Sequence, residues 1–172
     1  MKLDDDDYTL FDLPRRHTID RAELDARCRA LQSEVHPDRF AAQGDAAQRV
    51  AMQWAVRVNE AYRRLKDPLA RAAYLCELQG AAIDAENNTA MPAEFLMQQM
   101  AWREALDEAY DRDAVDALER SVDEVERKLY AEVVQRLDVE ADAAAAATPV
   151  RSLMFVRRFR QELDRQLDRF DA

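Results

Sequence analysis

Glycine and cysteine are scarce in this chain of 172 residues, which has two of each beside five prolines. So little glycine and proline excludes a collagen-like sequence and favours long helices. Cys28 and Cys76 are isolated, and their spacing fits neither a zinc site nor a disulfide framework. We therefore expect both thiols to be reduced and buried among the apolar side chains of helices.

Long apolar runs are also missing. No stretch approaches the roughly 20 apolar residues of a membrane span, and the N-terminal MKLDDDDYTLF lacks the apolar segment of a signal peptide. We expect its four aspartates, residues 4–7, to be a solvated lead-in. The net charge of -10 at pH 7 would repel nucleic acid and anionic lipid. We therefore expect no nucleic-acid partner and no membrane partner.

Helical periodicity is what the sequence has in abundance. Between residues 19 and 35, apolar side chains recur at steps of 4, 3 and 4, and the same kind of pattern extends from Asp45 to Lys66. Pro37 disfavours helical backbone at His36, so the first helix is expected to end at about Val35. Two helices of similar length joined by a loop of about ten residues are expected to form an antiparallel hairpin.

The rest of the chain also favours helices. A shorter one is expected at residues 69–78, and residues 80–92 have no clear period and are typical of a linker. Thr148 and Pro149 are expected to mark the start of the last helix. We therefore predict an all-α protein, with an N-terminal domain at 1–75, a helix end and linker at 76–92, and a three-helix domain at 93–172. The three helices of the last domain are expected at residues 93–110, 114–137 and 150–170.

The loop after the first long helix contains the residues of greatest chemical interest, His36, Pro37 and Asp38. A histidine base oriented by an aspartate would also need a nucleophile, an oxyanion site or a pocket, and the sequence indicates none of these. No second histidine or cysteine stands at metal-ligand spacing. We therefore expect no catalytic residue, no metal and no cofactor. By spacing alone, His36 and Asp38 would be helix caps.

The order of these elements resembles a J-domain. His36-Pro37-Asp38 lies between two long helices and is followed by NEAYRRLKDPLARAAYL, residues 59–75. The segments YTLFDLP, residues 8–14, and FLMQQMAWREALDEA, residues 95–109, are similar to the HscB-type J-domain co-chaperones of iron-sulphur cluster assembly. The resemblance covers essentially the whole chain. It implies an N-terminal J-domain and a C-terminal three-helix domain.

The resemblance also implies the partners. The C-terminal domain would bind the iron-sulphur scaffold protein IscU, and the J-domain would deliver it to HscA, a DnaK-type chaperone whose ATP hydrolysis it stimulates. Hydrolysis is then catalysed by HscA, so this chain is not itself an enzyme. No cysteine-rich segment precedes the J-domain, which favours a cytoplasmic member of bacterial type over a metal-binding variant.

The resemblance assigns the chaperone contact to the residues of the loop. Pro37 makes the loop rigid, and the carboxylate of Asp38 can accept two hydrogen bonds from an arginine. Nearby basic side chains would mainly raise the association rate, although they could also be ordinary solvated charges. Ser33 and Glu34 depart from the basic or neutral residues that often precede this loop. The expected chaperone-binding residues are His36, Pro37, Asp38, Arg27, Arg29 and Arg39.

The client site follows from the angles around the helix that begins at Ala93. Steps of about 100° place Phe95 and Trp102 on its core face and an apolar group on the opposite face. Apolar side chains rimmed by charge are typical of a partner site, although they could instead be buried against the J-domain or a dimer partner. With the resemblance, the expected client-binding residues are Leu96, Met97, Met100, Glu104 and Phe155. Ala101 and Met154 replace residues that are often charged, which makes the patch more apolar.

Two other hypotheses remain open. A J-protein serving a general DnaK-type chaperone would differ only in its C-terminal patch. A helical structural or dimerising protein would carry His36-Pro37-Asp38 by accident.

Overall fold

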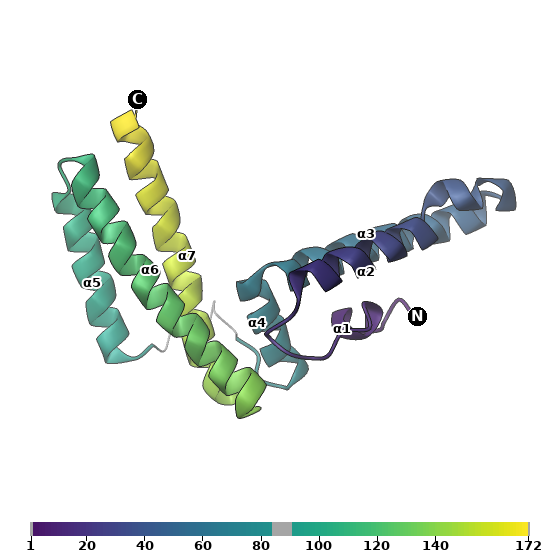
Figure 1. Cartoon of the computed structure of the whole chain (residues 1–172), viewed down its shortest axis with the longest axis horizontal. Coiled ribbons are helices and arrows are strands. Elements are labelled where there is room, and N and C mark those ends of the chain that lie inside the picture. The colour runs from purple at the N-terminus through teal and green to yellow at the C-terminus, as the bar shows by residue number, and fades with distance from the viewer. Residues whose placement is uncertain (1, 84–90, 172) are drawn as a thin grey trace. The chain divides into compact units, whose positions relative to one another are not determined.

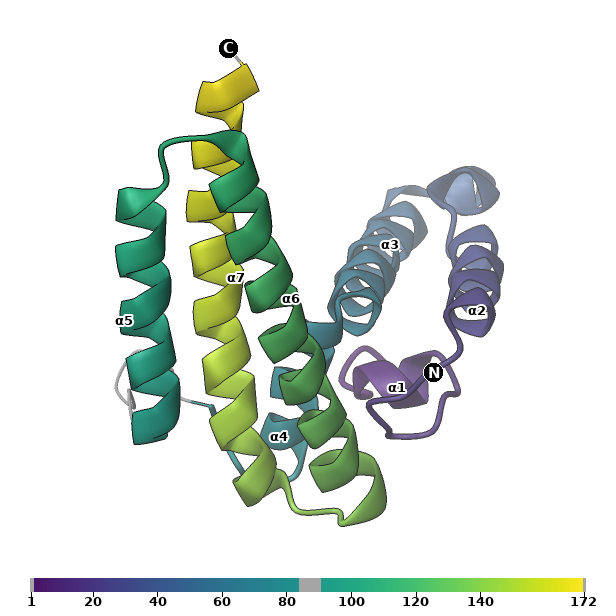
Figure 2. The same cartoon turned by 60° about the vertical axis from the view of Figure 1, so that its left-hand side comes forward.

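The computed structural model of the chain describes residues 2–83 and 91–171, except for the side chains of Ala41 and Asp171. Helices are the only regular secondary structure in this part of the chain, which confirms the all-α prediction. The chain divides into two compact units, Met1–Leu75 and Cys76–Ala172, whose helices are shown in Figures 1 and 2. In the same residues no helix is both long and apolar enough to cross a membrane.

The first unit is built on an antiparallel hairpin of α2 (Arg21–Glu34) and α3 (Asp45–Lys66) (Figure 1). Asp20 begins α2, because its side chain accepts hydrogen bonds from the backbone N–H groups of Ala22 and Glu23 at 2.8 and 3.3 Å. The predicted apolar stripes form the contact between the helices. The side chains that are buried there include Leu24, Cys28, Val58 and Leu65.

Two short helices complete the first unit. Tyr8 lies in α1 (Asp7–Leu10) and Phe11 in the turn after it, and the rings of both are buried. α4 (Pro68–Leu78) begins with a proline, whose missing N–H costs nothing at a first helical position. Tyr74 of α4 stacks on Tyr8 with 6.2 Å between the ring centroids, so α4 anchors α1.

The aspartate run at the N-terminus is part of the fold, and the expectation of a solvated lead-in is wrong. Asp6 caps α1 and pairs with Arg15 at 2.6 Å. Partial burial raises the pKa of Asp6, but hydrogen bonds from Thr9 and Arg15 outweigh it and lower the pKa to about 2. Asp7 is fully buried, and its carboxylate pairs with Arg57 of α3 at 2.7 Å and with Arg64 at 3.1 Å.

We expect Asp7→Ala to lower the free energy of unfolding of the first unit by about 3 kcal/mol, because it leaves two guanidinium groups without their buried partner. Amide hydrogen exchange of the full-length chain measures this as lost protection in peptides from residues 2–75. Asp4→Ala is the matched control from the same acidic run, because Asp4 is exposed. An equal loss of protection in both variants would contradict a specific role of the Asp7 ion pairs.

The second unit is a three-helix domain of α5 (Ala93–Glu108), α6 (Arg112–Val134) and α7 (Ala143–Asp171). α6 and α7 lie side by side in Figures 1 and 2. Arg160 of α7 links them by pairing with Asp123 and Glu126 of α6. The core of the unit consists of side chains from all three helices: Phe95, Trp102, Val115, Leu118, Val122, Val156, Phe159 and Leu163.

The start of α7 differs from the prediction. The helix begins at Ala143, so Thr148 and Pro149 do not mark its boundary. Asp142 supplies the cap by accepting a hydrogen bond from the N–H of Ala145 at 2.9 Å, and the alanines that follow have the highest helix propensity. Pro149 removes only one backbone hydrogen bond, and the helix continues through it. A π-helical turn at Gln135–Val139 connects α6 to this longer helix.

Both flanks of the expected linker pack within the second unit. Ile83 is buried, and its carbonyl oxygen accepts a hydrogen bond from Arg151 of α7 at 3.3 Å. Met91 packs against the core. The middle of the expected linker, residues 84–90, lies outside the described residues.

The two thiols are buried, as the sequence predicts, and neither forms a disulfide. Burial raises the pKa of Cys76 to about 11 and also raises that of Cys28. A thiol with a raised pKa is a poor nucleophile and a poor metal ligand at neutral pH.

Candidate partner-binding sites

The His36-Pro37-Asp38 sequence lies at the tip of the α2–α3 hairpin. α2 ends at Glu34, and the chain continues into the 3-10 helix η1 (Pro37–Gln43), which is more regular than the expected loop. Pro37 favours this because its fixed φ suits the first position of a helix. The side chains of His36 and Asp38 are 57% and 88% exposed, so both are available to a partner.

His36 has a local structural role. Its Nδ1 accepts a hydrogen bond from the backbone N–H of Asp38 at 3.3 Å, so the ring caps η1. The capping interpretation is therefore correct for His36. The carboxylate of Asp38 caps no helix end: its Oδ2 lies 3.6 Å from the ring nitrogen, at ion-pair rather than hydrogen-bond distance. It presents an exposed acceptor at the tip of the hairpin.

The three arginines of the predicted chaperone site differ in what they contact. Arg27 donates to Asp12, to Glu23 and to the carbonyl oxygen of Phe11, at 2.7, 2.6 and 3.0 Å. The hydrogen bonds to Asp12 and then to Glu23 raise the pKa of Arg27. Those to Asp12 and to the Phe11 carbonyl hold the turn after α1. Arg39 donates to the carbonyl oxygen of Ser33 at 3.1 Å, which covers the end of α2. Arg29 is exposed on α2.

Sequence reasoning placed the apolar face of α5 correctly. Leu96, Met97 and Met100 are 44%, 71% and 71% exposed, whereas Phe95 and Trp102 on the other side are 8% and 2% exposed. Gln99 is also buried on the core side of α5, and its amide donates to the sulphur of Met91 at 3.2 Å.

Phe155 of α7 packs against α5. Its half-buried ring meets Phe95 edge to face, with 6.1 Å between the centroids. The guanidinium carbon of Arg103 lies 5.9 Å from the centroid of the same ring, which is within cation–π range. We call Leu96, Met97, Met100 and Phe155 the apolar face of α5 and α7.

The charged rim of this face comes from the next turn of α5. Glu104 is exposed, four residues after Met100, so it lies beside the apolar face. Ala101 is also exposed, and Met154 is half-buried. Arg103 is exposed three residues after Met100, on the same side of α5. It is not among the predicted client-binding residues.

The described residues hold no group of three or more histidine, cysteine or acidic side chains that could bind a metal ion. The two candidate sites are an exposed polar loop on one unit and an exposed apolar face on the other.

Comparison with known proteins places the chain among co-chaperones. Residues 91–164 match the family model of the HSCB C-terminal oligomerisation domain. The co-chaperone HscB homologue of Burkholderia multivorans is 50% identical, over 100% of this chain and 99% of that protein. The homologue of Cupriavidus taiwanensis is 49% identical, over 99% of this chain and 98% of that protein.

Solved structures of co-chaperones are also similar to this chain. The chaperone HscB from Vibrio cholerae has a TM-score of 0.88 and 36% identity, and the match covers 95% of this chain and 99% of that one. Human co-chaperone HscB has a TM-score of 0.91 and 25% identity, over 100% of this chain and 86% of that one.

Proposed function

The chain belongs to the HscB family of co-chaperones, and from this premise we propose that it binds the scaffold protein IscU and delivers it to the DnaK-type chaperone HscA, whose ATPase it stimulates. The observation that carries the proposal is the presence of two exposed surfaces on two separate units. A protein that presents one partner to another needs two sites that can be occupied together. We propose that it acts in the cytoplasm.

The chaperone contact is assigned to His36, Pro37 and Asp38. The carboxylate of Asp38 is exposed and can accept a bidentate pair of hydrogen bonds from a chaperone arginine. The predicted basic residues, Arg27, Arg29 and Arg39, would contribute mainly to the association rate and would lose their effect at high salt. Arg27 and Arg39 already hold the tertiary structure, so Arg29 is the arginine that we assign to this role first.

The client contact is assigned to the apolar face of α5 and α7 with Glu104 on its rim. Methionine side chains adapt to the shape of a partner, and Met97 and Met100 are among the most exposed large apolar residues of the described chain. Burying such a face against IscU would remove apolar surface from water. The chain supplies no catalytic group to this process: in the proposal, HscA hydrolyses ATP and the cluster is cargo of IscU.

The test combines calorimetry with single-turnover ATP hydrolysis, using the full-length chain, IscU and HscA. We expect saturable binding of IscU and a rate of ATP hydrolysis by HscA that rises with the chain and rises further with both proteins. Stimulation without IscU binding would favour a general J-protein with a different client. Neither binding nor stimulation would favour a helical structural protein and would overturn the proposal.

A further inference from the structure

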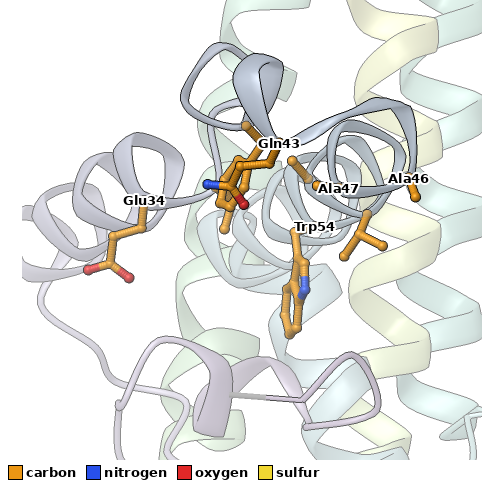
Figure 3. A pocket seen from close by; sticks show the side chains of 9 residues that line it. Glu34, Gln43, Ala46, Ala47 and Trp54 are labelled. Atoms are coloured by element: carbon orange, nitrogen blue, oxygen red, sulfur yellow. The ribbon is translucent and has the colours of Figure 1, made fainter.

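A cavity of about 540 Å³ opens beside the His36-Pro37-Asp38 tip. Figure 3 shows that its walls come from three neighbouring elements: Glu34 from the end of α2, Gln43 from η1, and Trp54 with two alanines from α3. Its surface is mainly apolar. The larger apolar side chains that line it are Val35, Phe40, Val50 and Trp54.

The cavity results from the unequal lengths of the two hairpin helices. α2 has 14 residues and α3 has 22, so the first turns of α3 extend past the end of α2 and are covered only by the short η1. Ala46 and Ala47 on this part of α3 are too small to fill the space. Val50 is 51% exposed as a result. Protein interiors are close-packed, so an open apolar cavity of this size is suited to a side chain from another molecule.

The cavity and the tip form one continuous surface. Val35 directly precedes His36, and Phe40 follows Asp38 by two residues. A molecule that contacts the exposed side chains of His36 and Asp38 therefore has an apolar cavity within reach of the same segment. Glu34 on the rim and Asp38 on the tip are both acidic and exposed.

We infer that this cavity is a second contact for the partner chaperone and takes an apolar side chain from an extended chaperone segment that also carries a basic residue. The inference rests on the proposed function and adds a specificity determinant to it. The basic residue pairs with Asp38 or Glu34, and the apolar neighbour fills the space between Val35, Phe40 and Val50. Glu34 would then select the chaperone by charge.

Val50→Glu tests the inference, with Val56→Glu as its matched control. Both valines lie on α3 and are about equally exposed, at 51% and 57%, but only Val50 lines the cavity. Glutamate is a good helix former, so both variants should fold. We expect Val50→Glu to raise the concentration of co-chaperone needed for half-maximal ATPase stimulation about tenfold, because a valine that the bound chaperone covers contributes roughly that factor. Val56→Glu should behave as wild type.

A spectroscopic test reports on the cavity itself. The chain has two tryptophans: Trp54 lines the cavity, and Trp102 is buried in the other unit. With both labelled as 5-fluorotryptophan, the ¹⁹F spectrum should show two signals. We expect ATP-loaded chaperone to shift the Trp54 signal and to leave the Trp102 signal in place. Trp54→Phe assigns the two signals.

Several outcomes would overturn the inference. Equal effects of the two valine variants, or an unchanged Trp54 signal while ATP hydrolysis is stimulated, would show that the chaperone does not enter the cavity. A Trp54 shift that depends on the concentration of the chain alone would assign the cavity to a second copy of this protein. A wild-type chain that fails to stimulate the chaperone at all would overturn both this inference and the proposed function.

Discussion

His36→Gln is expected to reduce stimulation of HscA at least tenfold, to nearly the basal rate, without changing the binding of IscU. The ring is 57% exposed and bonds only to the backbone N–H of Asp38 in the described contacts, so its loss should leave the hairpin folded. The expected loss is large because partner contacts at the centre of an interface contribute most of its affinity. Single-turnover ATP hydrolysis measures it, and retained IscU binding is the internal control.

Asp38→Asn tests whether the charge of Asp38, rather than the shape of its side chain, is needed to stimulate HscA. Asparagine keeps the size of the side chain but cannot accept two charge-assisted hydrogen bonds. We expect a loss similar to that of His36→Gln. If His36→Gln alone were inactive, the arginine contact assigned to Asp38 would be wrong. If both variants stimulated as wild type does, the assignment of the chaperone contact to His36-Pro37-Asp38 would fail.

A triple variant of Leu96→Ala, Met97→Ala and Met100→Ala is expected to weaken IscU binding at least 100-fold. The side chains are 44%, 71% and 71% exposed, and each should contribute about 1 kcal/mol or more when IscU buries it. Alanine has the highest helix propensity, so α5 should remain intact. Calorimetric titration measures the affinity, and circular dichroism checks the helix content.

The matched control for this variant is the pair Tyr110→Ala and Val139→Ala. These side chains are also large, apolar and exposed, at 85% and 67%, and lie in the same unit outside the apolar face of α5 and α7. The control should bind IscU as wild type does. Retained IscU binding by the folded triple variant would instead place the client site elsewhere on the chain.

Local patterns in the sequence were sufficient for much of the fold. The apolar spacing from Asp45 to Lys66 predicted the whole of α3, and Pro37 predicted the end of α2. These features depend on neighbours within a few residues along the chain, as helix formation itself does. The exposure of Leu96, Met97 and Met100 followed from angles around one helix for the same reason.

These local patterns could not predict contacts between residues that are far apart in the sequence. The acidic run predicted four solvated aspartates. Asp7 is nevertheless buried, because Arg57 and Arg64, about 50 residues later, pair with it. Pro149 predicted a helix start, yet α7 begins earlier because its cap is Asp142. Arg103 meets Phe155 from another helix.

The sequence by itself therefore determined the helices, their apolar faces and the exposed His36-Pro37-Asp38 loop, because each depends on short-range geometry. The tertiary structure alone decided the burial of Asp7, the contact between Arg103 and Phe155, and the cavity beside the loop. Each of these needs side chains from separate helices to meet, and the spacing within one helix carries no information about its partner.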